Sequence, residues 1–534
     1  MTVEDDAYDV VIVGSGGGLV GAYVAASRGL RTLVIEKTGL AGGTLSYSGG
    51  GSWFPGSAPI HRDGTGVEED VENARAYLRD IIADPSREHL QDAYLRAGAR
   101  LIDELERNPW FQSFVHGPVP DYFPASPGAS PAGRTVFPPP VDAAELGEHL
   151  RIVRETLPGE RWGYDPGPVL VGGRALIARA LAAFLGTGNG EIRLNTVLEG
   201  VLVEDGRVIG VEAVSDGKRV RFRAERGVIL AAGGFERDRH LRELHQSPLT
   251  GEWSNGAPAN TGDAIRAGLA VGGVAELLDE AWFAPGVIQP DGLPVFHTGT
   301  RGGIWVNGAG ERFVNETRPY DQAGHEILRL HATSGVRHIP CHWVFDQRHL
   351  DRDSFGGPPE EPMDPRWLES GALKKADTLG ELARLIDVPA EALDQTIKEF
   401  NSYAPGGVDE RFHRGESTWD RMFYDFVGLP ADPRQNFPVP PLPEWPNQLL
   451  LPIDTPPYYA ATIVPTDLGT KGGLKTDAHA RVLRSDGGPI AGLYAIGNTM
   501  AAMSGRVYPG AGTPIGSSLA FGYLAVLDIV GEAG

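Results

Sequence analysis

An α/β fold with a parallel sheet, interrupted by an inserted α+β domain, is the fold class that this sequence predicts. Residues 8–13 form a compact run of strand-forming apolar residues, and a glycine cluster, a helical pattern over 20–28 and a second strand over 31–35 follow it. Residues 227–232 and 493–496 are two more short apolar strands that run into glycines. Together these segments predict a Rossmann-like domain whose sheet begins in the first part of the chain and is completed near its end.

The length of the chain predicts more than one domain, because 534 residues are too many for one compact core. We expect the Rossmann-like domain to comprise residues 1–285 and 455–534, and a catalytic domain to be inserted as residues 286–454. Within the insert, a helical segment over 378–403 is broken by a Val-Pro pair. The many prolines of 429–446 disfavour regular structure and indicate a surface connector.

Local patterns predict the remaining elements of the first domain. Residues 170–185 have an apolar face and predict a helix that starts at a glycine pair. Residues 191–203 and 207–214 predict two strands joined at the Asp205–Gly206 turn. Residues 117–168 are rich in Pro and Gly and predict an irregular excursion over the surface.

The composition narrows the class of protein. Apolar residues make up 41% of the chain and 72 residues are Gly, which favours a folded chain whose backbone lies close to a large ligand. The net charge of −22 argues against nucleic acid partners and anionic membrane surfaces. The single cysteine, Cys341, excludes an internal disulfide framework and a multi-cysteine metal or iron–sulfur site, and we expect no metal.

The N-terminus and the hydropathy of the chain favour a cytoplasmic location. The chain does not open with a basic segment followed by an apolar run, as a secretory signal would. We also find no stretch that approaches the roughly 18 apolar residues of a membrane span. An apolar substrate would then be met in solution or at a surface, so a peripheral membrane contact stays open.

The first glycine cluster predicts a dinucleotide-binding unit. Gly14, Ser15, Gly16 and Gly18 lie between the first strand and the first helix, where backbone N–H groups bind a pyrophosphate at a helix N-terminus. Glu36 stands at the end of the second strand, 22 residues after Gly14, and suits a ribose hydroxyl.

One position departs from the usual glycine fingerprint. Leu19 occupies the place of the third glycine, so Gly18 or Gly21 is expected to supply the close packing of helix on strand. The glycine-rich residues 41–53 directly follow the ribose-binding acid, which favours a loop that lines a flavin over a flexible linker.

A loop near the C-terminus predicts the chemistry. Residues 504–516 place the phenol of Tyr508 four positions before the backbone amide of Gly512. Both groups are neutral donors, and a fixed pair of them can bind one developing oxyanion. Beside a dinucleotide fold, this pair predicts redox chemistry next to a ketone.

These motifs resemble those of the flavoprotein family of 3-ketosteroid Δ1-dehydrogenases, and the match runs nearly from end to end. Its carriers are VVIVGSGGG with Glu36, GGTLSYSGGGSWFP, PDY at 120–122, LVGGRAL, VILAAGGF, ERFVNE, RPYD at 318–321, DLGTKGGLKTD, GLYAIGNTMA and SGRVYPGAGTPIG. The wider fumarate-reductase and succinate-dehydrogenase flavoprotein group shares the glycine fingerprint, RFVNE and the late glycine strand. Only the tyrosine-bearing motifs point to the ketosteroid branch.

The resemblance implies an enzyme of steroid degradation. Members of this family oxidise ring A of a 3-ketosteroid, removing a proton from C2 and a hydride from C1, so that a C1–C2 double bond forms and FAD is reduced. By motif, Tyr320 corresponds to the base at C2 and Tyr122 to its hydrogen-bonding helper, while Tyr508 and the amide of Gly512 correspond to the pair that binds the C3 oxygen. The partner that reoxidises the flavin is not identified.

The resemblance also implies a Rossmann-like FAD-binding domain of the fumarate-reductase type. No Cys or His attachment motif stands out, so we expect noncovalent FAD. Beyond the fingerprint residues and Glu36, the residues expected to bind FAD are Lys37, Gly42, Gly43, Thr44, Ser48, Gly49, Gly50, Val201, Ala232, Gly233, Gly497, Asn498, Gly516, Ser517 and Leu519.

Two other flavoenzyme functions stay open at this point. A 3-ketosteroid Δ4-(5α)-dehydrogenase would keep FAD and the carbonyl-binding pair but act at C4–C5. A fumarate-reductase-like reductase of an unsaturated acid would use an arginine as proton donor, for which Arg318 is the candidate. Arg318 and His297 are otherwise expected to be structural. Phe123 stands where relatives often carry a second aromatic hydroxyl, which bears on pocket shape.

Overall fold

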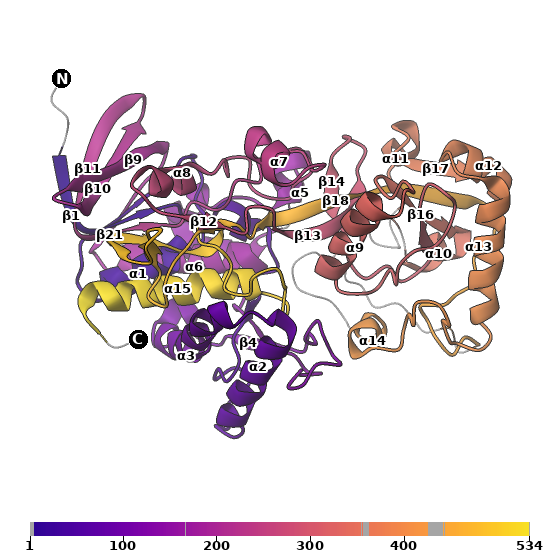
Figure 1. The fold of residues 1–534 in the computed structure, drawn as a ribbon, viewed down its shortest axis with the longest axis horizontal. Coiled ribbons are helices and arrows are strands. Elements are labelled where there is room, and N and C mark those ends of the chain that lie inside the picture. The colour runs from indigo at the N-terminus through magenta and orange to yellow at the C-terminus, as the bar shows by residue number, and fades with distance from the viewer. Residues whose placement is uncertain are drawn as a thin grey trace. The chain divides into compact units, whose positions relative to one another are not determined.

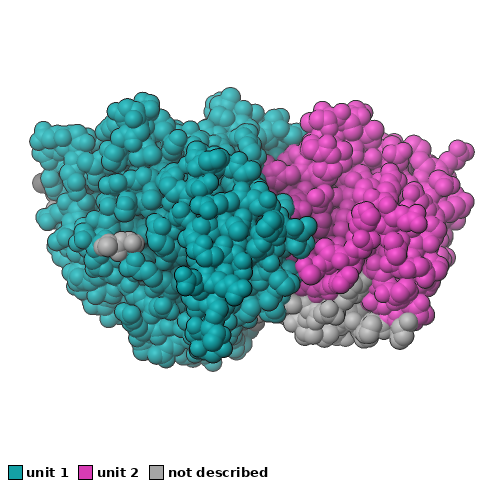
Figure 2. Space-filling view, turned by 60° about the horizontal axis from the view of Figure 1, so that its bottom comes forward, with its two compact units in different colours: residues 1–251, 256–281, 469–534 teal, residues 252–255, 282–468 magenta. Residues whose placement is uncertain are grey.

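The structure is a computed structural model that describes residues 5–165, 167–353, 355, 362–425, 442 and 444–532. Its chain forms two compact units, coloured teal and magenta in Figure 2. Unit 1 comprises residues 1–251, 256–281 and 469–534, and unit 2 comprises residues 252–255 and 282–468. The domain boundaries proposed from the sequence, after residues 285 and 454, stay predictions. Most of the proline-rich segment 429–446 lies outside the described residues.

Unit 1 is built on a parallel sheet, as the sequence predicts. Five strands lie side by side in the order β21 (Pro489–Ala495), β11 (Lys218–Leu230), β1 (Asp5–Val13), β2 (Thr32–Ile35) and β8 (Gly190–Arg193). They run parallel, so the carboxyl ends of the strands meet at one edge of the sheet. Strand β20 (Arg481–Leu483) pairs antiparallel with β21, while β9 (Thr196–Glu204) and β10 (Arg207–Ser215) extend β11 as a meander.

Helices cover the apolar faces of this sheet. The central strand β1 is buried over Val10–Ile12, as expected for a strand with helices on both faces. In Figure 1 the yellow helix α15 (Thr513–Val530) runs beside α1 (Gly18–Ser27). A Cβ on Gly21 of α1 would lie 3.6 Å from Gly522 of α15, so two glycines allow these helices to approach closely.

Gly18 supplies the close packing of helix on strand. A Cβ built there would lie 3.0 Å from the side chains of Ile12 in β1 and Ala231 beyond β11. Gly18 therefore takes the part of the third fingerprint glycine, while Gly21 faces another helix. Of the two candidates from the sequence, only Gly18 packs on the sheet.

One predicted strand is wrong. Residues 191–203 are not continuous, because β8 ends at Arg193 and β9 begins at Thr196. Asn195 between them has φ 51°, in the left-handed region that asparagine tolerates, and the chain leaves β2 there to pair with β10. The helix predicted over 170–185 is α6 (Gly172–Gly186).

The rest of unit 1 consists of short elements and two long helices, α2 (Val67–Ile82) and α3 (Glu88–Leu105). Residues 117–168 are mostly irregular, as predicted, with short strands and turns among them. These elements are η1 (Gly43–Tyr47), β3 (Ser52–Trp53), α2 (Val67–Ile82), η2 (Pro85–Arg87), α3 (Glu88–Leu105), η3 (Pro109–Phe111), β4 (Val115–Gly117), β5 (Thr135–Phe137), β6 (Val141–Asp142), α4 (Ala143–Leu146), η4 (Gly147–Ile152), α5 (Leu157–Trp162), β7 (Val169–Leu170), α7 (Arg239–His245), α8 (Asp263–Ala270), β12 (Ala275–Glu276), β19 (Gly473–Leu474) and η5 (Gly497–Thr499).

Unit 2 is an α+β unit around a second sheet. The strands lie in the order β14 (Pro294–Phe296), β13 (Ala281–Ile288), β18 (Tyr458–Thr470), β16 (Cys341–Asp346) and β15 (Ile304–Val306), and β17 (Leu373–Ala376) also pairs with β18. The helices of this unit include α10 (Gln347–Asp353), α11 (Arg366–Glu369) and α14 (Thr418–Asp425).

Helices pack on both faces of this second sheet. Successive side chains of a strand point to opposite faces. Trp343 and Phe345 of β16 accordingly share a core cluster with residues of α9 (Tyr320–Thr333), while Val344 joins a cluster with α12 (Leu379–Leu385) and α13 (Ala390–Tyr403). The predicted break between these last two helices is confirmed, since Pro389 precedes α13.

Helix α15 corrects one expectation about membrane spans. Its 18 residues have a mean hydropathy of 1.4, so by length and composition alone it is long and apolar enough to cross a membrane. However, 67% of this segment is buried inside the protein, as in the core helix of a globular unit.

Candidate active site

The predicted pyrophosphate site lies where β1 meets α1. Gly14 has φ 104°, and a Cβ there would lie 2.4 Å from the carbonyl oxygen of Ala231, so only glycine fits. Among the described residues no side chain caps α1, whose N-cap is Gly17. A Cβ on Gly16 would point at the Gly42 carbonyl, 3.5 Å away. A helix start without a side-chain cap fits a dinucleotide pyrophosphate.

Glu36 lies at the carboxyl end of β2, as predicted, and is buried. Its carboxylate accepts hydrogen bonds from the Ser15 hydroxyl (2.6 Å) and from the backbone N–H of Thr38 (2.9 Å). The Ser15 hydroxyl in turn accepts from the Gly42 N–H at 3.0 Å. Ser15 therefore links the acid of the second strand to both glycine loops.

The second glycine segment is ordered and packs on α6, so it is not a linker. The Ser48 hydroxyl donates to the Leu45 carbonyl (2.6 Å) and accepts from the Gly50 N–H (3.1 Å). A Cβ on Gly173 would lie 1.8 Å from the Leu45 carbonyl oxygen, so the glycine pair at the start of α6 is required for this contact. Of the other predicted residues here, Thr44 accepts from the Ala257 N–H at 2.8 Å.

Other predicted cofactor residues follow the ends of β11 and β21 at the same edge of the sheet. Ala232 and Gly233 follow β11 after one residue, Ala231, and Gly497 and Asn498 follow β21 after one residue, Ile496. The Thr499 hydroxyl donates to the Gly233 carbonyl at 2.8 Å and joins the two strand ends. The sheet topology thus brings four segments that were predicted to bind FAD, and that lie far apart in the chain, to one edge of the parallel sheet.

The remaining predicted cofactor residues have more varied surroundings. Lys37 forms an ion pair with Asp263 at 2.8 Å, and Val201 lies within β9. Gly516, Ser517 and Leu519 lie in α15, where Leu519 is fully buried in the core. The individual FAD contacts of all these residues stay predictions.

The structure brings two of the predicted catalytic tyrosines together in unit 1. The rings of Tyr122 and Tyr508 are 5.1 Å apart between centroids, at an angle of 51°. Both side chains are buried. The backbone N–H of Tyr122 also donates to the carbonyl of Pro509 at 3.0 Å, so the two loops are joined beside the rings.

Gly512 is the N-cap of α15 and has φ 89°. A Cβ there would lie 2.3 Å from the carbonyl oxygen of Gly51, so this position accepts only glycine. In the part of the chain that the structure describes, no acceptor binds the Gly512 N–H. This backbone donor stands at the start of a long helix, whose dipole favours negative charge.

A buried ionic network beside Tyr122 was missed by the sequence analysis. Asp121 accepts from the indole of Trp53 (2.8 Å) and the N–H of Ser130 (2.9 Å), and it pairs with Arg134. Burial raises the pKa of the Asp121 carboxyl to about 6, against the opposing charge of Arg134. The PDY motif contains this acid, but only the tertiary structure shows its partners.

Tyr320 belongs to unit 2, where it is the first residue of α9 after Pro319. Its ring packs edge-on against Phe296, with centroids 4.8 Å apart. The turn before it is held by α14, because Trp419 donates to the carbonyl of Thr317 at 2.7 Å. The side chain of Tyr320 is thus held by packing at a helix start.

His297 and Arg318, which were expected to be structural, are both partly buried and contact residues close to them in the chain. Burial lowers the pKa of His297 to about 4, and its ring lies 2.8 Å from the Thr300 hydroxyl. Burial also lowers the pKa of Arg318, whose guanidinium donates to Gln322 at 3.2 Å.

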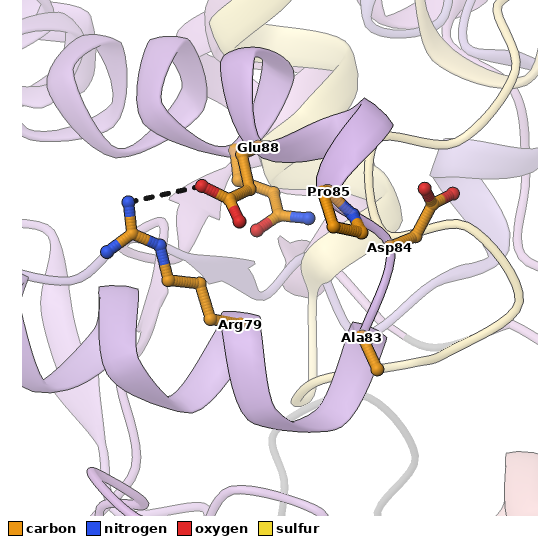
Figure 3. A pocket seen from close by; sticks show the side chains of 6 residues that line it. Arg79, Ala83, Asp84, Pro85 and Glu88 are labelled. Carbon is orange, nitrogen blue, oxygen red and sulfur yellow. Dashed lines mark ion pairs between the residues drawn. The ribbon is translucent and has the colours of Figure 1, made fainter.

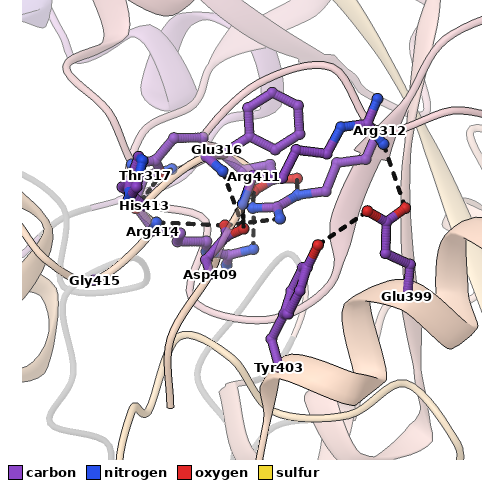
Figure 4. A network of polar contacts seen from close by, with 12 residues as sticks. Arg312, Glu316, Thr317, Glu399, Tyr403, Asp409, Arg411, His413, Arg414 and Gly415 are labelled. Carbon is purple, nitrogen blue, oxygen red and sulfur yellow. Dashed lines mark hydrogen bonds and ion pairs between the residues drawn. The ribbon is translucent and has the colours of Figure 1, made fainter. Parts of the chain in front are cut away.

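The RFVNE motif forms a buried ionic network in unit 2, shown in Figure 4. Glu316 accepts from Arg312 at 2.7 Å and from Arg414 at 3.0 Å, and Arg312 also pairs with Asp409 at 2.8 Å. The four side chains are buried. The two acidic and two basic side chains pair with one another, so the motif has a structural role in unit 2.

A surface pocket between α2 and α3 is not the candidate site. It measures about 130 Å³, and in Figure 3 Arg79 and Glu88 pair across it at 3.2 Å. None of the predicted site residues lines it.

Comparison with known proteins supports FAD as the cofactor of the glycine-rich edge of the sheet. A profile of the family described as "FAD binding domain" matches residues 9–515. The 3-oxosteroid 1-dehydrogenase of Mycolicibacterium smegmatis is 40% identical, over 98% of this chain and 98% of its own. The 4-oxocyclohexanecarboxylate 2-dehydrogenase of Sinomonas cyclohexanicum is 34% identical, over 98% of this chain and 93% of its own.

A solved structure agrees with the fold as a whole. The crystal structure of 3-ketosteroid Δ1-dehydrogenase from Sterolibacterium denitrificans, in complex with 1,4-androstadiene-3,17-dione, superposes with a TM-score of 0.86. It is 32% identical and covers 98% of this chain and 100% of its own. The chain therefore belongs to the FAD-binding family of flavoproteins and, within it, to the 3-ketosteroid Δ1-dehydrogenase family of FAD-dependent oxidoreductases.

Proposed function

We propose that this protein introduces a C1–C2 double bond into ring A of 3-ketosteroids. The observation that carries the proposal is the loop of Tyr508 and Gly512. In it, a buried phenol packed on Tyr122 stands four residues before a backbone N–H that has no acceptor among the described residues. The relatives named above support the proposal, because their sequences align with this chain over nearly its full length.

The chemistry requires that one carbon of a saturated bond be made acidic. Tyr508 and the Gly512 amide bind the C3 oxygen and stabilise the enolate that forms when C2 loses its proton. Removing one such donor typically costs about 10²–10³-fold in kcat. Neutral donors suit an apolar substrate, because burying an unpaired cation beside it costs several kcal/mol.

We assign the removal of the proton at C2 to Tyr320. A tyrosine hydroxyl is largely protonated at neutral pH, so this role requires donors that stabilise the phenolate. Bound FAD supplies the acceptor for the hydride from C1. The residues proposed to hold it are the Gly14–Gly18 loop, Glu36 and the segments at the ends of β11 and β21.

FAD is proposed to be bound without a covalent link. Cys341, the single cysteine, lies fully buried in β16 of unit 2, and burial raises the pKa of its thiol. Denaturing the purified holoprotein should therefore release free FAD into the supernatant. Flavin that stays with the precipitated chain would contradict this part of the proposal.

The reaction is tested by mixing the oxidised holoprotein anaerobically with androst-4-ene-3,17-dione while flavin absorbance is followed. The proposal expects full bleaching and a product whose NMR spectrum shows a C1–C2 double bond. A Tyr508→Phe variant should bleach about 10²–10³ times more slowly. With 5α-androstane-3,17-dione, a C4–C5 double bond would instead identify the Δ4 reaction.

A second substrate separates the steroid from smaller ring ketones. 4-Oxocyclohexanecarboxylate has the same ketone but also a carboxylate, and one relative is named for acting on it. Bleaching by this acid and not by the steroid would overturn the steroid assignment. Reoxidation of the reduced flavin by fumarate, with no bleaching of the oxidised flavin by either ketone, would overturn ketone chemistry altogether.

A further inference from the structure

Two buried hydroxyl groups outside the predicted site hold the loop that carries Tyr508 and Gly512. We propose that Thr135 and Tyr77 are positioning residues for this donor pair, an inference that rests on the proposed function. Each hydroxyl donates to a backbone carbonyl one residue away from a donor of the pair. Neither residue belongs to a motif that the sequence analysis singled out.

Thr135 orients the Gly512 amide through a shared peptide plane. Its hydroxyl donates to the carbonyl oxygen of Ala511 at 2.7 Å. That carbonyl and the Gly512 N–H belong to the same planar trans peptide, so they point in opposite directions. Fixing the direction of the Ala511 carbonyl therefore also fixes the direction of the Gly512 N–H. The carbonyl oxygen of Gly51 also lies close to the loop, 2.3 Å from where a Cβ of Gly512 would lie.

Thr135 is itself held on a rigid element. It lies fully buried in β5, the middle strand of the three-stranded sheet β3-β5-β4, and is paired with Trp53 on one side and Gly117 on the other. Donors placed on strands keep their direction better than donors placed on loops.

Tyr77 joins the loops of both tyrosines. From α2, its fully buried hydroxyl donates to the carbonyl of Pro509 at 2.6 Å and accepts from the N–H of Phe123 at 3.2 Å. Pro509 follows Tyr508 in the chain, and Phe123 follows Tyr122. One phenol thus bridges the two segments whose rings pack at 5.1 Å.

Thr135 and Tyr77 act by orienting the donor pair of Tyr508 and Gly512, and not by contact with the substrate. An oxyanion donor must point at the place where charge develops, and a displacement of about 1 Å can cost about 10²-fold in rate. Loss of either hydroxyl should therefore lower kcat and leave KM for the steroid nearly unchanged.

The test compares isosteric variants of the FAD-loaded protein. Thr135→Val should lower kcat for androst-4-ene-3,17-dione tenfold or more with KM within threefold, and Thr135→Ser, which keeps the hydroxyl, should stay within threefold of the parent. Thr32→Val is the matched control, because Thr32 is also buried in unit 1 and donates to a backbone carbonyl, that of Leu30, at 3.0 Å. A Thr135→Val enzyme within twofold of the parent, or a Thr135→Ser enzyme as slow as Thr135→Val, would overturn the role of Thr135.

For Tyr77 the sharper measurement is a double-mutant cycle. Tyr77→Phe should lower kcat about tenfold in the parent but less than threefold in a Tyr508→Phe background, since residues that act through one another are not additive. Equal factors in the two backgrounds would show a general structural effect and overturn the role of Tyr77. Tyr494→Phe, which loses a hydroxyl bonded to Asp528 at 2.8 Å, is the matched control.

Hydrogen exchange separates this inference from the proposed function. In the holoprotein, the peptide covering 508–516 should exchange at least tenfold faster in Thr135→Val than in Thr135→Ser, whether or not a steroid is turned over. Unchanged exchange overturns the inference. A Tyr508→Phe enzyme that keeps the parent rate, with exchange behaving as expected, overturns the catalytic proposal and leaves the loop-holding role standing.

Discussion

Replacing Gly512 with alanine tests whether the start of α15 places a donor. The φ of 89° costs an L residue about 1–2 kcal/mol. The new Cβ would also lie 2.3 Å from the Gly51 carbonyl oxygen, which is backbone and cannot swing away. Ordinary contact requires the loop to move by about 1 Å, and such a displacement costs about 10²-fold in rate. Forced overpacking adds about 1–3 kcal/mol to the loss of stability.

The matched control is Gly531→Ala at the other end of the same helix. Gly531 also has a left-handed φ, 74°, but a Cβ there meets nothing within 4 Å. We expect both variants to lose about 1–2 kcal/mol of unfolding free energy from strain, measured by urea titration, and Gly512→Ala to lose more. Only Gly512→Ala should lose about 10²-fold in kcat for androst-4-ene-3,17-dione. If the two variants have kcat values within threefold of each other, the reasoning about Gly512 is refuted.

Two further predictions concern unit 2. Glu316→Gln should lower the free energy of unfolding in urea by about 3–5 kcal/mol, because it breaks the buried ion pairs with Arg312 and Arg414. Glu399→Gln is the control: it breaks a partly exposed pair with Arg411 and should change that free energy by less than about 1 kcal/mol. Equal losses in the two variants would contradict the importance of the buried network. Because burial holds the pKa of His297 at about 4, below its ordinary 6.5, the unfolded state binds the extra proton and stability should fall as pH drops from 6.5 to 4, by about 3 kcal/mol for this group. Urea titrations at pH 7 and pH 4.5 should show a smaller fall in His297→Gln, and an identical fall would count against a neutral buried histidine.

The position of the FAD-binding unit could be predicted because its signals are local. Strand, glycines, helix, strand and acid follow one another within 36 residues, and parallel pairing places the ends of β1 and β2 at one edge. The late strand β21 could be predicted to join the same sheet, because it too is apolar and runs into glycine. The strand over 191–203 was wrong because its apolar pattern continues across Asn195, where the backbone turns.

The sequence by itself determined the parallel α/β unit, the family and the candidate tyrosines, because these depend on periodicity and on motifs of contiguous residues. The tertiary structure alone decided that Tyr122 and Tyr508 pack together although they are far apart in the chain, and that Thr135 and Tyr77 donate hydrogen bonds to the backbone of the loop that follows Tyr508. It also decided that Gly18 packs on the sheet while Gly21 packs on α15. Contacts of this kind depend on which distant segments the fold brings side by side, and no local pattern records that choice.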